Sequence, residues 1–231
     1  MFADVPARLA EVRARIADAA GRSGRDPADI RLIAVSKTFP LDAIRAAWDA
    51  GQREFGENKV QEGLQKIARA ADMKIRWHLL GHLQSNKAKK AATHFACIQA
   101  VDRAELVDRL EAAASAAGAA PELLVQVDLA LEPTKHGAPR EALGGIFARA
   151  RECRAVRVVG LMLLPPFAED PEDARPWFRR LRDLRDALAA DGVPAAMLRE
   201  LSMGMSHDFE VAVEEGATMV RVGTAIFGSR T

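Results

Sequence analysis

Ile30-Arg-Leu-Ile-Ala-Val-Ser36 is a short apolar run that is partly β-branched, and a helical segment at residues 41–50 follows it closely. The run has the length and composition of a strand that is buried on both faces. Gly51 ends the helical segment, and the order of strand and then helix repeats along the chain. This alternation predicts a parallel sheet, because parallel neighbours are joined through crossover helices.

The repeated pattern predicts eight strands. We expect them at residues 30–36, 53–56, 75–80, 95–101, 123–129, 156–164, 198–203 and 219–222, with the later helices near residues 59–71, 86–92, 103–117, 139–153, 172–190 and 207–215. Eight strands in 231 residues favour an α/β fold of the closed (β/α)8 TIM barrel type, with a doubly wound open sheet as the alternative. No linker or low-complexity segment divides the chain, so we expect residues 1–231 to form one domain.

The N-terminal segment is expected to form an extra helix. Its apolar residues recur at helical spacing, at Val5, Leu9, Val12 and Ile16. The sequence stops too soon after the last strand for a full eighth helix, so we expect the N-terminal helix to cover that gap in the outer layer. Asp102 is expected to cap the helix that begins at residue 103.

Charge and composition exclude several classes of partner. Lys and Arg number 33 and Asp and Glu number 32, so the net charge of +1 provides no basic field for nucleic acid or an anionic membrane. The longest uncharged apolar stretch, residues 158–168, is too short to span a bilayer, and early charged residues argue against a signal peptide. Cys97 and Cys153 make no disulfide framework, so we expect a cytoplasmic protein.

The histidines do not predict a metal site. His78 and His82 are four residues apart, a spacing that suits metal ligands on a helix, but their stretch has the pattern of a strand and a turn. No nearby acidic residue supplies a third ligand, and His94, His136 and His207 are scattered along the sequence. We therefore expect no bound metal.

A lysine closes the first predicted strand, in Val35-Ser-Lys37. In a parallel barrel, functional residues gather at the carboxyl ends of the strands. One interpretation is structural, with Lys37 extending its ammonium group into solvent at the mouth of the barrel. The other is chemical, because a lysine whose pKa is lowered forms a Schiff base with an aldehyde.

The last two strands end in small and hydroxyl-bearing residues, in Ser202-Met-Gly-Met-Ser206 and Arg221-Val-Gly-Thr224. In many TIM barrels the loops after the seventh and eighth strands bind a phosphate through backbone N–H groups. Ser206, Gly223 and Thr224 fit that role, although each hydroxyl could instead serve as a helix cap.

These features together indicate pyridoxal 5′-phosphate (PLP). The first and eighth strands are neighbours in a closed barrel, so Lys37 is expected to stand beside Arg221 and near the phosphate-binding residues. PLP needs a lysine for its aldehyde and a separate site for its phosphate. Arg221 is placed to meet the ring nitrogen, and because arginine keeps its protons, that nitrogen would stay unprotonated.

Six motifs, spread in order over about residues 30–228, carry a resemblance to a known family. They are Ala34-Val-Ser-Lys-Thr38, Phe55-Gly-Glu-Asn58 with Val60-Gln-Glu62, Trp77-His78 with Gly81 and Leu83-Gln-Ser-Asn-Lys87, Gly160-Leu-Met162, Leu201-Ser-Met-Gly-Met-Ser206 and Met219-Val-Arg-Val-Gly-Thr-Ala-Ile-Phe-Gly228. In these motifs the chain resembles the YggS/PROSC family of pyridoxal phosphate homeostasis proteins. The resemblance implies a barrel of PLP fold type III, similar to the N-terminal domain of alanine racemase but without its C-terminal β-domain.

The resemblance also implies a role for each motif residue. Lys37 carries the cofactor as a Schiff base. Ser206, Gly223 and Thr224 hold the phosphate, Arg221 faces the ring nitrogen, and Asn58, which could otherwise cap a helix, lies near the cofactor. No residue is implied to be catalytic. The chain departs from the family at His207, where an acidic residue is usual, and at Phe209, where an aliphatic residue is usual.

Two functions fit these features. The first is the binding, storage and delivery of PLP, with apo PLP-dependent enzymes as candidate recipients and no established turnover. The alternative is a weak PLP-dependent amino-acid racemase, which the sequence disfavours because alanine racemases use a tyrosine and this sequence has none. A module that binds RNA or protein and also holds PLP stays open, although the net charge gives it no support. A monomer is the expected state.

Overall fold

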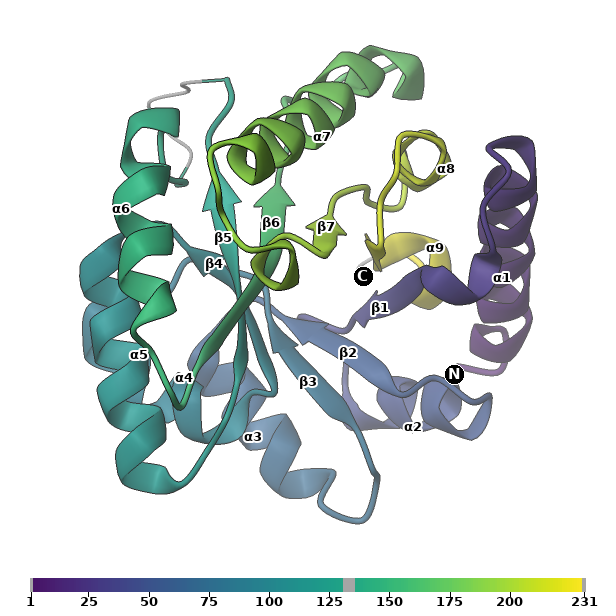
Figure 1. Cartoon of the computed structure of the whole chain (residues 1–231). Helices are drawn as coiled ribbons and strands as arrows, with labels where there is room; N and C mark the ends of the chain where they lie inside the picture. Colours follow the sequence, from purple (N-terminus) through teal and green to yellow (C-terminus); the bar gives the residue numbers. More distant parts are fainter. Residues whose placement is uncertain (1, 131–135, 230–231) are drawn as a thin grey trace.

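The computed structural model describes residues 2–130 and 136–229 and contains a closed barrel of eight parallel strands (Figure 1). The strands, paired in chain order with the last closing on the first, are β1 (Arg31–Val35), β2 (Glu54–Glu57), β3 (Arg76–Leu79), β4 (Cys97–Val101), β5 (Glu122–Val127), β6 (Arg157–Leu163), β7 (Glu200–Ser202) and β8 (Met219–Val222). Closure is direct, because Ala34 of β1 pairs with Phe55 on one side and with Val222 on the other. The predicted TIM barrel is confirmed, and the open sheet is excluded.

Helices surround the barrel and bury its outer face. They are α1 (Val5–Arg22), α2 (Leu41–Asp49), α3 (Val60–Arg69), α4 (Ala88–His94), α5 (Ala104–Ala117), α6 (Arg140–Arg151), α7 (Arg175–Ala190), α8 (Phe209–Glu214) and α9 (Thr224–Phe227). The N-terminal α1 packs against α2, α8 and the short α9, so it covers the gap in the helical layer as predicted (Figure 1). Its buried residues include all four that defined the expected helix.

Three sequence predictions differ from the structure in detail. The strands are mostly shorter than expected, because their end residues turn into loops after the last ladder hydrogen bond. Asp102 does not cap α5, whose N-cap is Arg103; the Asp102 carboxylate contacts the side chains of Arg103 and His82 instead. Helix α8 begins at Phe209 rather than at His207, because the Asp208 carboxylate accepts the N–H of Met205 (2.6 Å) and closes a turn before the helix.

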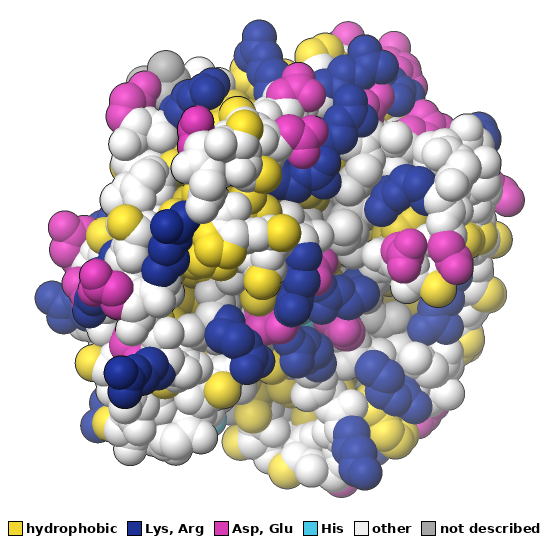
Figure 2. Space-filling view, in the orientation of Figure 1, with side chains coloured by type: hydrophobic (Ala, Val, Ile, Leu, Met, Phe, Trp, Pro, Cys, Tyr) yellow, Lys and Arg dark blue, Asp and Glu magenta, His cyan; other side chains and the backbone are white. Residues whose placement is uncertain are grey.

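The N-terminal end of the barrel is closed by ion pairs between adjacent strands and between strands two positions apart. Arg31 of β1 pairs with Glu200 of β7 (2.5 Å), and Arg76 of β3 pairs with Glu122 of β5 (2.5 Å). Glu54 of β2 takes part in the same group through Arg76 (3.9 Å). On the face drawn in Figure 2, basic and acidic side chains are interspersed, as expected from the net charge of +1.

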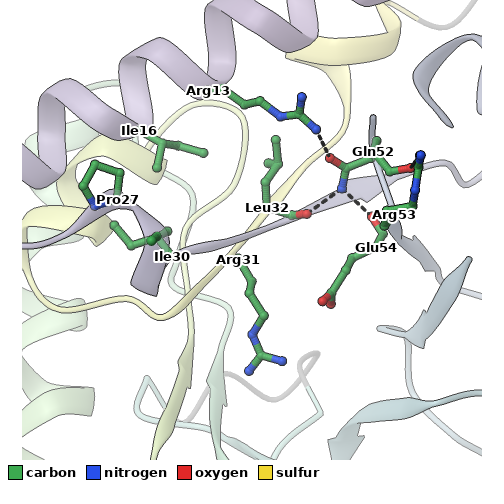
Figure 3. A pocket seen from close by; sticks show the side chains of 10 residues that line it. Arg13, Ile16, Pro27, Ile30, Arg31, Leu32, Gln52, Arg53 and Glu54 are labelled. Carbon is green, nitrogen blue, oxygen red and sulfur yellow. Dashed lines mark hydrogen bonds between the residues drawn. The ribbon is translucent and has the colours of Figure 1, made fainter. Parts of the chain in front are cut away.

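A cavity of about 390 Å³ lies beside this closed end, between α1 and the starts of β1 and β2 (Figure 3). Gln52 is buried at its wall and donates hydrogen bonds to the carbonyl oxygens of Leu32 (2.6 Å) and Glu54 (2.7 Å), while Arg13 donates to the Gln52 Oε1 (3.2 Å). The amide of Gln52 therefore already has protein partners. We interpret this cavity as part of the stabilising end of the barrel, because functional sites of this fold lie at the opposite end.

Two further findings bear on the sequence predictions. Among the described residues, no helix combines the length and apolar composition that crossing a bilayer requires. Cys97 and Cys153 are both free thiols, and Cys97 is buried inside the barrel.

Candidate cofactor-binding site

A cavity of about 370 Å³ opens at the carboxyl end of the barrel, and it brings together every cofactor-binding residue that the sequence predicts. These residues are Lys37, Asn58, Ser206, Arg221, Gly223 and Thr224. The other lining residues are mostly apolar and include Val35, Phe39, Leu80 and Met162. The volume is within the range of small-molecule sites, and apolar walls with a few convergent polar groups are typical of such sites.

The backbone around Lys37 is held in an unusual conformation. Thr38 adopts a φ of 68°, in the left-handed region that residues with a Cβ rarely occupy. Its N–H donates to the Glu62 carboxylate (2.5 Å), and the Lys66 ammonium donates to the carbonyl oxygen of Ser36 (2.7 Å). Contacts on both sides of Lys37 therefore fix the point at which its side chain leaves β1. Strain of this kind costs about 1–3 kcal/mol and is common at functional sites.

A buried charged cluster supports this end of β1, and the sequence analysis missed it. The Lys66 ammonium of α3 donates to Glu57 Oε1 (2.8 Å) and to Glu62 Oε1 (2.7 Å), and the Ser36 hydroxyl donates to Glu57 Oε1 (2.6 Å). Burial raises the pKa of Glu57 although Lys66 and Ser36 oppose the change. Burial also acts to raise the pKa of Glu62, but the hydrogen bonds from Lys66 and Thr38 outweigh it and lower that pKa. The spacing of four residues between Glu62 and Lys66 on a predicted helix is the signal that could have indicated the cluster.

The predicted phosphate-binding residues meet between β7 and β8. The Ser206 hydroxyl oxygen accepts hydrogen bonds from the N–H groups of Gly223 (3.0 Å) and Ala225 (3.4 Å). Ser206 thus lies where the backbone N–H groups at the start of α9 converge. Gly204 makes the turn before it with a φ of +89°, and a Cβ there would lie 2.5 Å from the Cβ of Ala212. This turn allows the β7 loop to pack closely against α8.

Asn58 follows β2 and is half-buried at the wall of the cavity. Its backbone is packed against Gly81, where a Cβ would lie only 2.2 Å from the Asn58 carbonyl oxygen. Glycine is therefore required at residue 81 for the loops after β2 and β3 to approach each other. The helix cap considered for Asn58 is not formed, because the N-cap of α3 is Lys59 and no side chain caps that helix.

Arg221 of β8 is buried, with 4% of its surface exposed, and its side chain crosses the barrel interior toward β6 and β7. It donates to the Ser202 hydroxyl (2.6 Å) and to the carbonyl oxygen of Leu163 (2.8 Å). Burial lowers the pKa of the Arg221 guanidinium to about 10, and the nearby Asp208 carboxylate opposes that change. Arg221 therefore keeps its positive charge at neutral pH.

A chain of buried side chains continues from Arg221 through the barrel. The Ser202 hydroxyl accepts from Arg221 and donates to Gln99 Oε1 (2.6 Å). The Gln99 amide nitrogen then donates to His78 Nδ1 (3.1 Å), and His78 Nε2 donates to Glu54 (2.6 Å). An amide nitrogen can only donate, so His78 Nδ1 accepts from Gln99, and His78 is neutral with its proton on Nε2. The chain connects the cavity to the charged N-terminal end of the barrel.

The histidines take positions that the sequence did not predict. His78 is buried in this chain, whereas His82 is partly exposed after β3, so the two do not share a site. The expectation that His136 belongs to no ligand cluster is wrong, because His82, Asp102 and His136 lie together. His207 lines the cavity, is exposed, and meets the carbonyl oxygen of Glu169 through Nε2 (2.8 Å).

Comparison with known families identifies the class to which the fold belongs. The family model of the alanine racemase N-terminal domain matches residues 8–231. An alanine racemase from Clostridium difficile 630 superposes with a TM-score of 0.75 at 14% sequence identity, and the match covers 98% of this chain and 57% of that one. The protein thus has a barrel of the alanine racemase N-terminal type. The distant racemase structure supports this assignment for the fold alone.

Closer relatives narrow the class. The pyridoxal phosphate homeostasis protein of Aquifex aeolicus (strain VF5) is 44% identical over 96% of this chain and 97% of its own, and that of Escherichia coli (strain K12) is 41% identical over 98% and 97%. PipY of Synechococcus elongatus PCC7942 superposes with TM-scores of 0.87 without PLP and 0.86 with PLP bound, at 41% and 40% identity, over 97% of this chain and all of that one. The chain belongs to the YggS/PROSC family of pyridoxal phosphate homeostasis proteins.

The internal chain predicts how stability depends on pH. Burial lowers the pKa of His78, although its hydrogen bond to Glu54 acts in the opposite direction. Below the unfolded-state pKa of about 6.5, the unfolded chain binds the proton more readily than the folded one, so stability is lost as the pH falls. The midpoint of thermal unfolding should therefore decrease between about pH 7.5 and pH 5.5, and the decrease should be smaller in His78→Gln.

The exposed His94 on α4 provides the matched control. His94→Gln should keep the wild-type decrease. The comparison uses the change with pH within each protein, so a lower absolute stability of His78→Gln does not affect it. Equal decreases in wild type and His78→Gln would show that His78 is not held neutral.

Proposed function

We propose that the cavity at the carboxyl end of the barrel binds PLP and that the protein holds and supplies this cofactor for intracellular PLP homeostasis. The observation that carries the proposal is that all six residues predicted from the sequence line one cavity of suitable size. The curated relatives named for pyridoxal phosphate homeostasis and the PLP-bound structure of PipY support it.

The chemistry of the lining residues fits PLP. When bound, PLP supplies an aldehyde that can join covalently to an amine. Lys37 provides that amine at the end of β1, where the contacts of Thr38 and Ser36 fix its origin. The apolar residues Leu80 and Met162 provide walls for a flat ring, and Asn58 adds a polar group beside it.

The phosphate would be bound between Ser206 and the start of α9. The N–H groups of Gly223 and Ala225 already point at the Ser206 hydroxyl, and Thr224 adds a second hydroxyl at the same edge of the cavity. Backbone N–H groups and hydroxyls of this kind donate hydrogen bonds to a phosphate without requiring a lysine or arginine.

Arg221 would face the ring nitrogen of PLP. Because its guanidinium stays charged at neutral pH, it donates a hydrogen bond and leaves that nitrogen without a proton. An unprotonated ring withdraws electrons from a bound amino acid less strongly than a protonated one. The position of Arg221, fixed by Ser202 and the carbonyl oxygen of Leu163, therefore favours holding the cofactor over using it in catalysis.

The proposed role is that of a carrier without useful turnover. The racemase alternative needs a second base on the opposite face of the substrate, and the sequence has no tyrosine to serve as that base. We propose apo PLP-dependent enzymes as recipients of the cofactor, a monomer as the working unit and the cytoplasm as the compartment.

The first test concerns Lys37. After incubation with PLP and reduction by borohydride, the mass of the reduced cofactor should be found on the peptide that contains Lys37. Lys37→Ala should lose this label, whereas Lys59→Ala, which changes an exposed lysine at the start of α3, should keep it. Labelling that persists in Lys37→Ala and maps to Lys59 or Lys87 would contradict the assignment.

The second test concerns the phosphate. Ser206→Ala and Thr224→Ala each remove a hydrogen bond to a charged group, worth about 1.5–3 kcal/mol, so the affinity for PLP should fall about tenfold or more in each. The affinity for unphosphorylated pyridoxal should change little, because that ligand has no phosphate. Thr93→Ala, on the exposed face of α4, is the control and should leave both affinities unchanged. Equal losses for the two ligands would assign Ser206 and Thr224 a different role.

The third test separates the carrier from the racemase. The PLP-loaded protein is incubated with saturating L-alanine, L-serine or L-lysine, and the D-isomers are measured by chiral chromatography. We expect amino acids to change the absorbance of the bound cofactor without racemisation approaching about 1 s⁻¹, the low end of ordinary enzymes. Faster racemisation that disappears in Lys37→Ala would establish an enzyme and exclude the carrier role as proposed here.

A further inference from the structure

Two histidines and an aspartate from three different loops meet at the carboxyl end of the barrel. His82 follows β3, Asp102 follows β4 directly, and His136 lies between β5 and α6. One ligand atom of each residue lies within 4.8 Å of the corresponding atoms of the other two. None of the three lines the proposed PLP cavity, so this cluster is separate from that site.

The backbones of His82 and His136 are anchored although their side chains reach the surface. His82 stands between Gly81, which packs against the Asn58 backbone, and the fully buried Leu83. The carbonyl oxygen of His136 accepts a hydrogen bond from the buried Gln126 side chain.

The residues next to His136 and Asp102 are held as well. Two residues beyond His136, Ala138 exchanges backbone hydrogen bonds with β5 and the residue that follows it, through Gln126 (2.8 Å) and Asp128 (3.0 Å). Asp102 directly follows the last residue of β4. Each of the three ligands thus lies next to residues that the barrel holds in place.

The three ligand atoms lie close enough together for side-chain rotation to bring them to one metal ion. Bonds from zinc to imidazole nitrogen or carboxylate oxygen are about 2.0–2.2 Å, which places tetrahedral ligand atoms about 3.4 Å apart. His82 Nδ1 and Asp102 Oδ2 are already 3.5 Å apart. The rings of His82 and His136 are stacked with centroids 3.7 Å apart and planes at 14°, and the exposed His136 brings a ring nitrogen to within 4.8 Å of the other two ligand atoms.

The remaining contacts hold the carboxylate in place. Arg103 donates to Asp102 Oδ1 (2.5 Å) and to the Ser85 hydroxyl (2.8 Å), which leaves Oδ2 directed at His82. An outer hydrogen bond of this kind orients a ligating group.

We propose that His82, Asp102 and His136 form a binding site for a divalent transition-metal ion, with Zn²⁺ as the probe. Two imidazoles and one carboxylate suit Zn²⁺ and similar ions and would leave a position open for water or a further ligand. Such an ion would join the loops after β3, β4 and β5 and so stabilise the mouth of the barrel. The proposal does not rest on PLP binding.

The test uses the full chain without an affinity tag, after dialysis against a chelator. Titration calorimetry with Zn²⁺ should give one site per chain, and Co²⁺ should give the visible absorption of a bound ion. His82→Ala, His136→Ala and Asp102→Asn should each lower the affinity for Zn²⁺ at least tenfold. Zn²⁺ should also raise the midpoint of thermal unfolding of the wild type and not of these variants.

Two controls make the result specific. His94→Ala removes an exposed histidine from α4 and should leave the Zn²⁺ affinity unchanged, and Lys37→Ala should do the same because the cluster is separate from the PLP cavity. Circular dichroism would confirm that each variant is folded. Fewer than one ion per chain, or an affinity that His82→Ala and His136→Ala leave unchanged, would overturn the proposal. A loss confined to Lys37→Ala would place the ion at the PLP cavity and overturn it equally.

Discussion

One row of buried hydrogen bonds, all donated in the same direction, orders the interior of the barrel. Arg221 donates to the Ser202 hydroxyl, and that hydroxyl donates to Gln99 Oε1. Gln99 thus presents its amide nitrogen to His78, so His78 carries its proton on the side of Glu54. A positive charge at one end and a carboxylate at the other favour each hydrogen bond of this row, and each bond in it pairs a donor with an acceptor.

The barrel has a cluster of charged side chains at each end, and the two clusters stabilise different parts of the structure. At the N-terminal end, the ion pair of Arg31 with Glu200 joins β1 to β7 across β8, and similar ion pairs close this end of the barrel. At the carboxyl end, Lys66 binds Glu57 and Glu62 near the end of β1. Its third contact, to the carbonyl oxygen of Ser36, fixes the backbone next to Lys37. Removing one member of a buried pair leaves an uncompensated charge at a cost of about 3–5 kcal/mol. The contacts of Lys66 that stabilise the fold therefore also hold Lys37 in its position.

The sequence predicted what depends on periodicity and on strand ends. The alternation beginning at residues 30–36 predicted the barrel. The rule that function lies at the carboxyl ends of strands predicted that Lys37 and Arg221 lie close together, and both line one cavity. The row of hydrogen bonds from Arg221 to Glu54 was missed because Gln99 and Ser202 are single polar residues within strands. The periodicity of a sequence does not show which side chains of different strands meet inside the barrel. The cluster of His82, Asp102 and His136 was missed for the same reason, since loops distant in sequence meet only when the barrel closes.

The rigidity of these supports bears on how a cofactor would be held and released. Under the proposed function, Lys37 and Arg221 contact PLP from strand ends that buried networks fix in place. The phosphate side is different, because Thr224 and His207 are exposed at the edge of the cavity. The phosphate would thus be bound at the end of the cavity that solvent reaches, while the ring and the aldehyde are bound at the end that the fold holds still. A carrier needs this division, because tight positioning keeps the cofactor bound and an accessible phosphate allows a recipient to compete for it.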